Sequence, residues 1–505
     1  MGATRREWLG LVVLALPCLV YAMDLTVLNL AVPSLTADLH PSGTQLLWIV
    51  DVYGFLLAGS LITLGTLGDR IGRRRLLLIG AAAFAATSLV AAWAPSAAVL
   101  IAARAVQGLA GATIAPSTLS LIRTMFTDPQ QRTVAISVWI TSYSAGAAVG
   151  PLLGGVLLER FWWGSVFLLS VPVMVLLLAV GPRLLPEYRD PSPGRLDLAS
   201  AGLSLVAVLA VVYGLKQIAQ QGVGQPALAA VVLGLALAVV FVRRQRRLAK
   251  PFLDLRLFRL PAFSAALTSY GLGIFVIFGI DLLIGQYLQL VLGLSPLRAG
   301  LWVVPSALGF IVGSMLAPRL SSVVRPAVIM TVGSLAGALG FAMLTFVGGR
   351  YGLALIVTGT TVLAVGLAPV FTLATDVVVG AAPEEGAGAA SAISETAAEL
   401  GGALGIALLG SIGSAVYRSQ VPDALPAHGT LGGAVQSASR LPAQVGTPLL
   451  DAAREAFTHG LQVTAGVCVA ILLLGAAVTA FLLRHPAPEQ VEVAPALALA
   501  EVGCP

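Results

Sequence analysis

Charged side chains are scarce in this sequence, and their scarcity excludes a water-soluble fold. Asp, Glu, Lys and Arg together make up 10% of the 505 residues, whereas apolar residues make up 58%. Soluble domains carry roughly 25% charged residues, so this chain has too few to cover a water-soluble body of its length. Apolar stretches of about 20 residues, the length that crosses a bilayer core, recur along the whole chain. The sequence therefore predicts an all-α membrane protein.

Cysteine is also rare, and its rarity removes further classes of protein. The three cysteines show no paired spacing for a disulfide framework, a metal centre or a redox motif. No Gly-x-x-x-x-Gly-Lys-Ser/Thr phosphate loop occurs, which argues against an ATP-driven pump. We therefore expect no metal, no cofactor and no enzymatic site.

Fourteen apolar windows are candidates for membrane-spanning helices. Glycine (55 residues) and proline (29 residues) are compatible with such helices, because small residues let helices in a bilayer approach closely and neighbouring helices satisfy backbone groups freed by proline. We predict 14 transmembrane helices arranged as six, two and six. The windows lie at about 9–33, 47–67, 76–94, 98–121, 133–156, 163–181, 198–218, 226–242, 262–288, 298–317, 327–347, 352–378, 388–415 and 457–483.

The basic residues are unevenly divided between the two sides of the predicted membrane. With the N-terminus assigned to the cytoplasm, the cytoplasmic segments contain 21 of the 29 Lys and Arg residues and the external segments contain seven. This bias follows the positive-inside rule and predicts that both termini are cytoplasmic. It also explains the sequence pI of about 9.5 without a nucleic-acid partner.

The span pattern predicts a division into four parts. Residues 1–182 form an N-terminal six-helix bundle, and 183–260 contain an inserted helix pair followed by a basic cytoplasmic linker. Residues 261–484 form a C-terminal six-helix bundle with one long external segment at 416–456, and 485–505 form a disordered tail. Many transporters pair two such halves around a central cavity that opens alternately to each side.

A turn rich in glycine and arginine stands between the second and third predicted spans. Residues 65–75 read GTLGDRIGRRR. The glycines permit a tight turn, Asp69 suits the neighbourhood of a helix N-terminus, and the arginines favour the cytoplasmic face. This string resembles the signature loop of the major facilitator superfamily. The resemblance implies conformational roles for Gly65, Asp69, Arg70, Gly72 and Arg73.

Strings in the fourth and fifth spans also resemble motifs of this superfamily. Residues 104–108 read RAVQG and are similar to its second motif. Arg104 is a costly residue inside a span, so we expect it either in a structural ion pair or beside a coupling acid. Residues 146–155 read GAAVGPLLGG and resemble the antiporter motif of its exporters. The conformational residues in that string are Gly146, Gly150 and Gly154, which are one turn apart and permit a close helix crossing, and Pro151, which permits a bend.

Three further strings of residues resemble motifs of one family within this superfamily. Residues 23–33, MDLTVLNLAVP, resemble the first-span motif of the fourteen-helix drug:proton antiporter family. Residues 48–53, WIVDVY, and 394–401, SETAAELG, are similar to the QacA, LfrA and SmvA group of multidrug efflux pumps in that family. The resemblance covers about residues 9–483 and implies the major facilitator fold with transport by alternating access.

Carboxyl groups inside the spans are the candidates for proton coupling, because a charge held at mid-bilayer costs several kcal/mol. Burial favours the protonated form of a carboxyl and a nearby cation favours the ionised form, so a proton and a cationic drug compete for it. We predict proton coupling by Asp24, Glu395 and Glu399, with Arg104 as an electrostatic neighbour. The two glutamates are four residues apart on one helix face, where they can share a proton.

Other intramembrane acids and aromatic residues are candidates for substrate binding. Asp51 is either a helix-terminal acid in water or a group that attracts a cationic substrate, and Asp281 is either a rim residue or a cation site. Aromatic rings supply apolar and cation–π surface. The predicted substrate-binding residues are Asp51, Trp48, Tyr53, Tyr143, Asp281 and Phe275. Asp376 is expected near the cytoplasmic end of its span, in a solvated or gating role.

The residues and the resemblance together predict a monomeric, proton-coupled antiporter in the bacterial cytoplasmic membrane. Its expected substrates are lipophilic and mainly cationic drugs, antiseptics and dyes, and its driving force is the proton gradient. Two alternatives stay open. One is a dedicated exporter of a single metabolite or self-made antibiotic on the same scaffold, and the other is a transceptor or a non-transporting lipid-handling protein.

Overall fold

A computed structural model gives the fold of residues 3–41, 43–188, 197–221, 224–248, 255–382, 387–421, 430–438 and 440–482. Every regular element in these ranges is a helix. The predicted tail at 485–505 and residues 249–254 of the basic linker lie outside the described residues. The all-α fold predicted from composition is confirmed.

The helices have the length and composition that a bilayer requires. Within the described residues, 13 helical segments are long and apolar enough to cross a membrane, and Ala199–Leu215 forms a shorter apolar helix. These segments agree with the 14 predicted spans. The chain is a multi-pass membrane protein.

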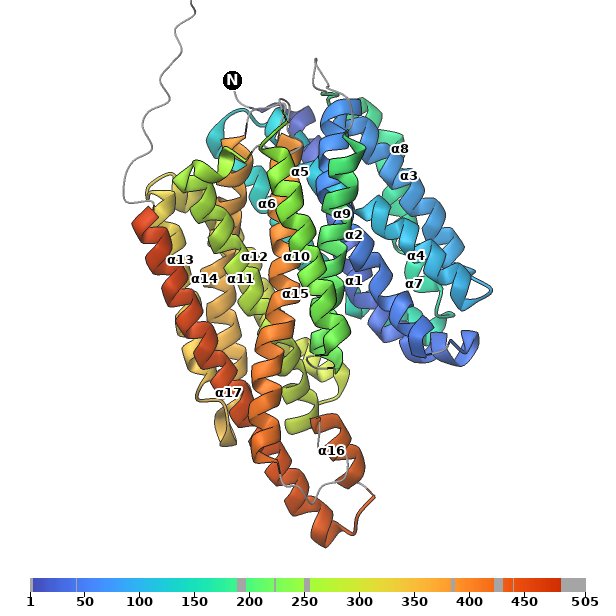
Figure 1. Ribbon diagram of the computed structural model, residues 1–505, viewed down its shortest axis with the longest axis vertical. Coiled ribbons are helices and arrows are strands. Elements are labelled where there is room, and N and C mark those ends of the chain that lie inside the picture. Colours follow the sequence, from blue (N-terminus) through green and yellow to red (C-terminus); the bar gives the residue numbers. More distant parts are fainter. Residues whose placement is uncertain are drawn as a thin grey trace, which may run out of the picture.

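Two groups of helices make up most of the molecule (Figure 1). The N-terminal bundle contains α1 (Arg5–Leu39), α2 (Gly43–Ile71), α3 (Arg73–Ala92), α4 (Ala97–Gly111), α5 (Ile114–Met125), α6 (Pro129–Arg160), α7 (Ser165–Leu168) and α8 (Ser170–Leu184). The C-terminal bundle contains α11 (Pro261–Gln286), η2 (Tyr287–Val291), α12 (Pro296–Ser321), α13 (Pro326–Leu344), α14 (Gly352–Ala381), α15 (Ala387–Gln420), α16 (Leu431–Ala438) and α17 (Ala443–Leu482). Two short 3-10 turns, η1 (Leu257–Arg259) and η3 (Gly349–Tyr351), precede α11 and α14.

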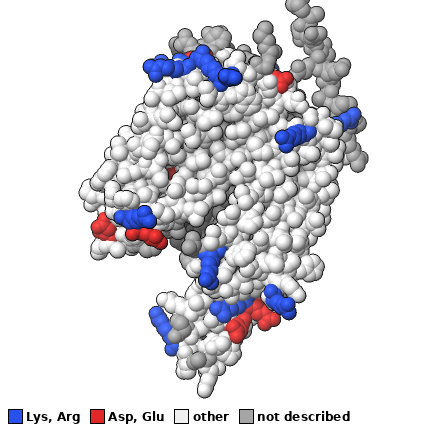
Figure 2. All heavy atoms as spheres, turned by 180° about the vertical axis from the view of Figure 1, so that it is seen from behind, with Lys and Arg blue, Asp and Glu red and all other residues white. Residues whose placement is uncertain are grey.

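The two ends of the molecule differ in charge. Arg6, Arg74 and Arg244 lie at one end, here called the basic end, where helices α1, α3 and α10 (Gln225–Gln245) begin or end. The other end, here called the distal end, carries α7 and α16 (Figure 1). Figure 2 shows a band of Lys and Arg across the basic end, whereas blue and red side chains lie together at the distal end.

Helices α9 (Leu198–Gln221) and α10 connect the two bundles along the chain, and α9 packs against α10, α2 and α15. At the basic end the Nη2 atom of Arg244 lies 3.0 Å from Oδ1 of Asp197, and the Ser200 hydroxyl donates to Oδ2 of the same carboxylate over 2.6 Å. The hydrogen bonds from Arg244 and Ser200 hold the pKa of the Asp197 carboxyl well below its usual range. This ion pair ties the two helices together.

The fourth predicted span, 98–121, is confirmed as part of the membrane-spanning segment Ala97–Met125, but the helix is interrupted within it. Helix α4 ends at Gly111 and α5 begins at Ile114. Pro116 explains the break, since proline has no N–H to donate and its ring clashes with the carbonyl four residues earlier, that of Ala112. The Thr113 hydroxyl turns back and donates to the Ala110 carbonyl over 2.7 Å.

The predicted external segment 416–456 is largely helical. Helix α15 continues to Gln420, α16 occupies Leu431–Ala438, and α17 begins at Ala443. The two long helices therefore extend past the apolar region and carry α16 at the distal end (Figure 1). The predicted thirteenth span therefore ends too early, at 415, and the predicted fourteenth begins too late, at 457, because the polar residues of these extensions do not interrupt helical geometry.

Candidate functional site

The centre of the N-terminal bundle contains an ion pair between α1 and α4. The Arg104 Nη1 atom lies 2.5 Å from Oδ2 of Asp24, and the two side chains are only 1% and 9% exposed. A buried pair of this kind is stable only while both partners are charged, because removing one charge leaves the other uncompensated in a low dielectric. The state of Asp24 is therefore coupled to the position of Arg104.

A buried polar chain extends from Arg104 to α3 and α8. Arg104 Nη1 donates to the Gln107 side-chain oxygen over 3.3 Å, and Gln107 Nε2 donates to the Ser88 hydroxyl over 2.8 Å. The Ser170 hydroxyl donates to Ser88, also over 2.8 Å. On the other side, the guanidinium carbon of Arg104 stands 4.4 Å from the centre of the Tyr53 ring, a cation–π contact. These contacts fix the guanidinium in front of Asp24.

The second acidic group lies on α15, in the C-terminal bundle. Glu395 is 9% exposed, and within the described residues its Oε1 atom has no hydrogen-bond partner. Glu399, one turn further along, is half-buried and accepts a hydrogen bond from the Tyr21 hydroxyl over 3.5 Å. A buried carboxyl oxygen without a partner is costly as an anion, so Glu395 is suited to carry a proton.

Tyr21 links helix α1 to Glu399 of the other bundle, and it is not among the residues predicted from the sequence. It lies on α1, three residues before Asp24 and therefore on the same side of the helix. Helix α1 thus presents an acid to Arg104 within its own bundle and a hydroxyl to Glu399 of the other bundle. The i, i+3 spacing of Tyr21 and Asp24 was the signal available in the sequence.

Aromatic rings surround this position. The Tyr21 ring centre lies 6.3 Å from that of Tyr53 and 5.5 Å from that of Tyr143, and Tyr143 lies 4.7 Å from Trp139. Two of the predicted substrate residues, Tyr53 and Tyr143, therefore belong to one aromatic cluster beside the acids. Such rings offer apolar contact area and negative faces that suit a lipophilic cation.

Other predicted substrate residues lie outside this cluster. Trp48 is 43% exposed and its ring meets that of Phe55 edge to face, and the Phe55 ring in turn lies beside Tyr213 of α9. Asp281 is exposed on α11, about 200° around the helix from Gly279, which packs on α15. The structure therefore does not bring Trp48 or Asp281 to the acids of α1 and α15.

Two remaining candidates lie on α11 and α2, which both pack against α15. The backbone of Phe275 on α11 lies directly against Gly405, where α11 crosses α15. Asp51 is half-buried in the first turns of α2, two residues before Tyr53 and so on a different side of the helix. Phe275 therefore contributes to packing of the helix that carries the glutamates.

Asp69 joins the two bundles at the basic end. Its carboxylate accepts hydrogen bonds from the backbone N–H groups of Gly388 and Ala389, both over 3.2 Å, in the first turn of α15. Arg73, only 1% exposed, holds the same carboxylate with Nε at 3.0 Å. Free N–H groups and the positive end of the helix dipole attract a carboxylate at this position. The helix terminus beside Asp69 thus belongs to the opposite bundle.

Neighbouring glycines of the same turn allow this contact. At Gly65 an added Cβ would come within 2.7 Å of the Gly388 carbonyl oxygen, so only glycine lets α2 and α15 cross so closely. Gly72 has φ of 109°, in the region that favours glycine, and lies between α2 and α3. Arg70, half-buried at the end of α2, completes this turn.

A second link between the bundles was not recognised as a pair in the sequence. The Arg132 Nε atom on α6 lies 2.6 Å from Oδ1 of Asp376 on α14, and the Thr133 hydroxyl donates to Oδ2 over 2.7 Å. Asp376 was singled out as a solvated or gating acid, but Arg132 was counted only as a topology signal. Nothing local in the sequence pairs residues 244 positions apart.

The glycine stripe of α6 holds α1 in place. The backbone of Leu19 lies directly against Gly146, and an added Cβ at Gly154 would come within 2.6 Å of Val27. Gly150 and Pro151 occupy the α6 turn between them. The stripe thus fixes the helix that carries Tyr21 and Asp24.

The contacts between the bundles are arranged asymmetrically. The links through Asp69 and Asp376 lie at the basic end, and the Tyr21–Glu399 contact lies further toward the middle. Toward the distal end the bundles diverge, and Figure 2 shows the surface hollowed between them. This is the arrangement of a carrier that is closed at one end and open at the other.

Comparisons with known proteins agree with this architecture. The family model of the Major Facilitator Superfamily matches residues 14–406. The multidrug efflux pump LfrA of Mycolicibacterium smegmatis is 45% identical over 488 residues, which are 95% of this chain and 97% of LfrA. The methyl viologen resistance protein SmvA of Salmonella typhimurium is 35% identical over 487 residues, which are 93% of this chain and 97% of SmvA.

A solved structure shares the fold at low sequence identity. The crystal structure of the human organic anion transporter MFSD10 (TETRAN) aligns with a TM-score of 0.60 and 15% identity, covering 94% of this chain and 100% of that chain. The family match and the two bacterial relatives extend over most of the sequence. The chain therefore belongs to the Major Facilitator Superfamily, a family of membrane transporters rather than of enzymes.

Proposed function

We propose that this protein is a proton-coupled antiporter that exports lipophilic, mainly cationic compounds by alternating access. The relatives LfrA and SmvA support export, since one is named a multidrug efflux pump and the other a methyl viologen resistance protein. The expected substrates are drugs, quaternary ammonium antiseptics and dyes such as ethidium. An ion gradient drives carriers of this kind, and no cofactor takes part.

One observation carries the proposal. Helix α1 meets Arg104 through Asp24 and meets Glu399 of the other bundle through Tyr21. Acids of both bundles therefore lie close to the same helix, at the boundary that must open and close during transport. A rearrangement of the bundles changes the surroundings of these carboxyl groups, and a change of their charge biases the rearrangement.

The proposed cycle begins with the distal side open. Protons from that side bind Asp24, Glu395 and Glu399, and protonation of Asp24 removes the counter-charge of Arg104. The links through Asp69 and Asp376 then part, and the site opens to the basic end. A lipophilic cation that enters among the aromatic rings favours the ionised carboxylates, so the protons leave and the loaded carrier returns.

The proposed topology follows from the charge distribution. The basic end faces the cytoplasm and both termini lie there, as the positive-inside rule requires of the end that holds most Lys and Arg. We assign residues 1–182 and 261–484 to the two moving halves and 183–260 to the inserted helix pair. The carrier acts as a monomer in the bacterial cytoplasmic membrane.

The test uses ethidium uptake into inverted membrane vesicles energised by a proton gradient. Wild type accumulates the dye, and a protonophore abolishes the accumulation. Asp24→Asn, Glu395→Gln and Glu399→Gln lower gradient-driven uptake at least tenfold, whereas Glu455→Gln, an exposed acid on α17, leaves it unchanged. Full gradient-driven uptake in Asp24→Asn combined with Glu395→Gln would contradict the coupling assignment.

The same assay separates the alternatives. A dedicated exporter of one metabolite ignores ethidium while a proton gradient persists, and a non-transporting protein moves no dye with or without the gradient. Asp51→Asn and Asp281→Asn distinguish substrate attraction from proton coupling. Loss of affinity for ethidium at an unchanged maximal rate is the expected result for a residue that only attracts the cation.

A further inference from the structure

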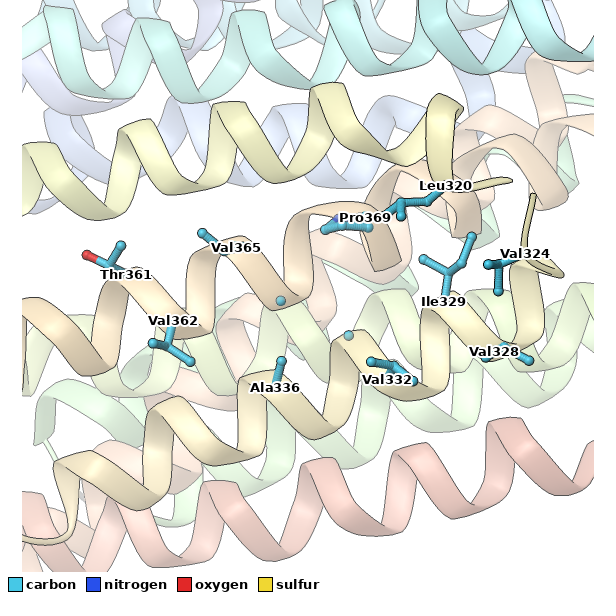
Figure 3. Close-up of a pocket in the computed structure, with 12 residues that line it drawn as sticks. Leu320, Val324, Val328, Ile329, Val332, Ala336, Thr361, Val362, Val365 and Pro369 are labelled. Carbon is cyan, nitrogen blue, oxygen red and sulfur yellow. The ribbon is translucent and has the colours of Figure 1, made fainter. Parts of the chain in front are cut away.

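An apolar groove lies on the outer surface of the C-terminal bundle, away from the acids. It has a volume of about 580 Å³ and runs between the end of α12, α13 and α14 (Figure 3). Almost all of its wall is hydrocarbon, with the Thr361 hydroxyl as an exception. Val328, Val332 and Val365 are exposed and open it sideways, in the direction of the bilayer.

The groove is a built feature of the helix packing. At its floor Gly333 and Gly366 bring the backbones of α13 and α14 into contact, since an added Cβ at Gly333 would come within 2.5 Å of the Gly366 carbonyl oxygen. Pro369 of α14 faces Leu320 of α12 across the basic end of the groove (Figure 3). Because glycine has no side chain, a depression forms over these two residues. The surrounding valines border it.

The dimensions match one half of a bilayer. Val328 and Ala336 border the groove eight residues apart on α13, and eight residues of helix span about 12 Å. The hydrocarbon core of a bilayer is roughly 30 Å thick, so the groove extends over most of one leaflet. It starts at the basic end, where α12 ends and α13 begins.

Two exposed arginines are sequence neighbours of residues that line the basic end of the groove. Arg319 and Arg325 are exposed and adjoin Leu320 and Val324, which line its end. Within the part of the chain that the structure describes, neither guanidinium has an ion-pair partner. Basic sites between transmembrane helices bind the headgroups of anionic lipids.

We propose that this groove is a binding site for an anionic phospholipid of the leaflet at the basic end. Arg319 and Arg325 bind the phosphate, and one acyl chain fills the depression over Gly333 and Gly366. The charge of the headgroup determines which amphiphile binds, because the two arginines attract an anionic lipid and repel the lipophilic cations of the proposed transport function. The bound lipid contacts α14, which also carries Asp376 and its link to the N-terminal bundle.

Native mass spectrometry of the purified full chain tests the proposal with phosphatidylglycerol and phosphatidylcholine of identical acyl chains. Each arginine near the membrane surface contributes about 1 kcal/mol toward an anionic lipid, so two give a roughly 30-fold preference for phosphatidylglycerol. Arg319→Gln combined with Arg325→Gln removes this preference. Arg298→Gln, an exposed arginine at the opposite end of α12, keeps it.

A second pair of variants tests the acyl-chain part. Val332→Phe fills the groove from an exposed position and lowers retention of both lipids, whereas Val232→Phe, similarly exposed on α10, does not. Exposed positions are chosen so that folding is preserved, which the thermal unfolding midpoint verifies. Equal retention of the two lipids by wild type, or an unchanged preference in the double arginine variant, overturns the headgroup assignment. Undiminished retention in Val332→Phe overturns the groove as the acyl-chain site.

Discussion

Replacing Asp376 by Asn is expected to shift the carrier toward the state that is open at the basic end. The substitution removes the ion pair with Arg132 but keeps an oxygen for the Thr133 hydroxyl, so the helix packing is preserved. A hydrogen bond to a charged group contributes roughly 1.5–3 kcal/mol. Loss of that contribution from the closed state alone changes the ratio of the two states by a factor between about 10 and about 160.

Spin labels at Gln130 and Ser322, exposed at the basic end of the two bundles, report this ratio as a distance distribution. Wild type in detergent is expected to show mainly the shorter distance, and Asp376→Asn a larger share of the longer one. Asp197→Asn is the matched control, since it breaks an ion pair within the inserted helices rather than between the bundles. If Asp376→Asn leaves the distribution unchanged, the Arg132 contact does not hold this end closed.

Three further predictions follow from single contacts. Gly146→Val is expected to lower the thermal unfolding midpoint and transport because the backbone of Leu19 occupies the space, whereas Gly155→Val, with no atom near its Cβ position, is tolerated in both assays. Arg104→Lys is expected to lose most gradient-driven ethidium uptake, because an ammonium lacks the planar, forked donor group with which Arg104 reaches Asp24 and Gln107 while lying over the Tyr53 ring; uptake near the wild-type rate would show that charge alone suffices. The pKa of Asp197 is lowered in the folded state, so its ion pair contributes stability above the unfolded value of about pH 4 and loses it on acidification. The midpoint difference between wild type and Asp197→Asn in thermal scans is therefore largest near neutral pH and shrinks below pH 4; a constant difference would contradict the assignment.

The fold was largely predictable from the sequence, because a helix that crosses a bilayer must be apolar over the length of the hydrocarbon core. Apolar length marks each span, and the fourteen windows agree with the helices of the structure. Interruption inside a span is harder to predict, as the break before Pro116 shows, since proline in a membrane helix bends some helices and ends others. The extensions of α15 and α17 at the distal end lie outside the predicted spans, because a hydropathy window ends where the apolar residues end, whereas a helix can continue beyond the bilayer.

The candidate site was predictable in its residue types and less so in its partners. Asp24 and Arg104 were both singled out, and their 2.5 Å contact joins positions that the sequence places in different spans. Glu395 and Glu399 share a face by spacing, yet the Oε1 atom of Glu395 has no hydrogen-bond partner among the described residues, whereas Glu399 meets Tyr21. Helical periodicity predicts which residues share one face of a helix, but not which residues of other helices that face contacts.

The contacts of the aromatic residues were equally hard to predict from the sequence. Trp48 and Tyr53 are five residues apart on α2, and both were predicted to contact substrate. The structure turns Tyr53 toward Arg104 and Trp48 toward Phe55 and α9. In a soluble helix the polar face would have marked the outside, but in a membrane helix both faces are apolar.

The inserted helix α9 changes which routes into the carrier are available. Its residues Val208, Leu209 and Val212 pack with Phe55 of α2 and with Leu400 and Ala403 of α15, so they cover the seam between the bundles next to Glu399. A lipophilic molecule that diffuses in the bilayer cannot enter through this seam, because α9 covers it. Lateral access to the acids on this flank would require α9 to swing away, which makes the inserted pair a barrier that selects the path by which a passenger arrives.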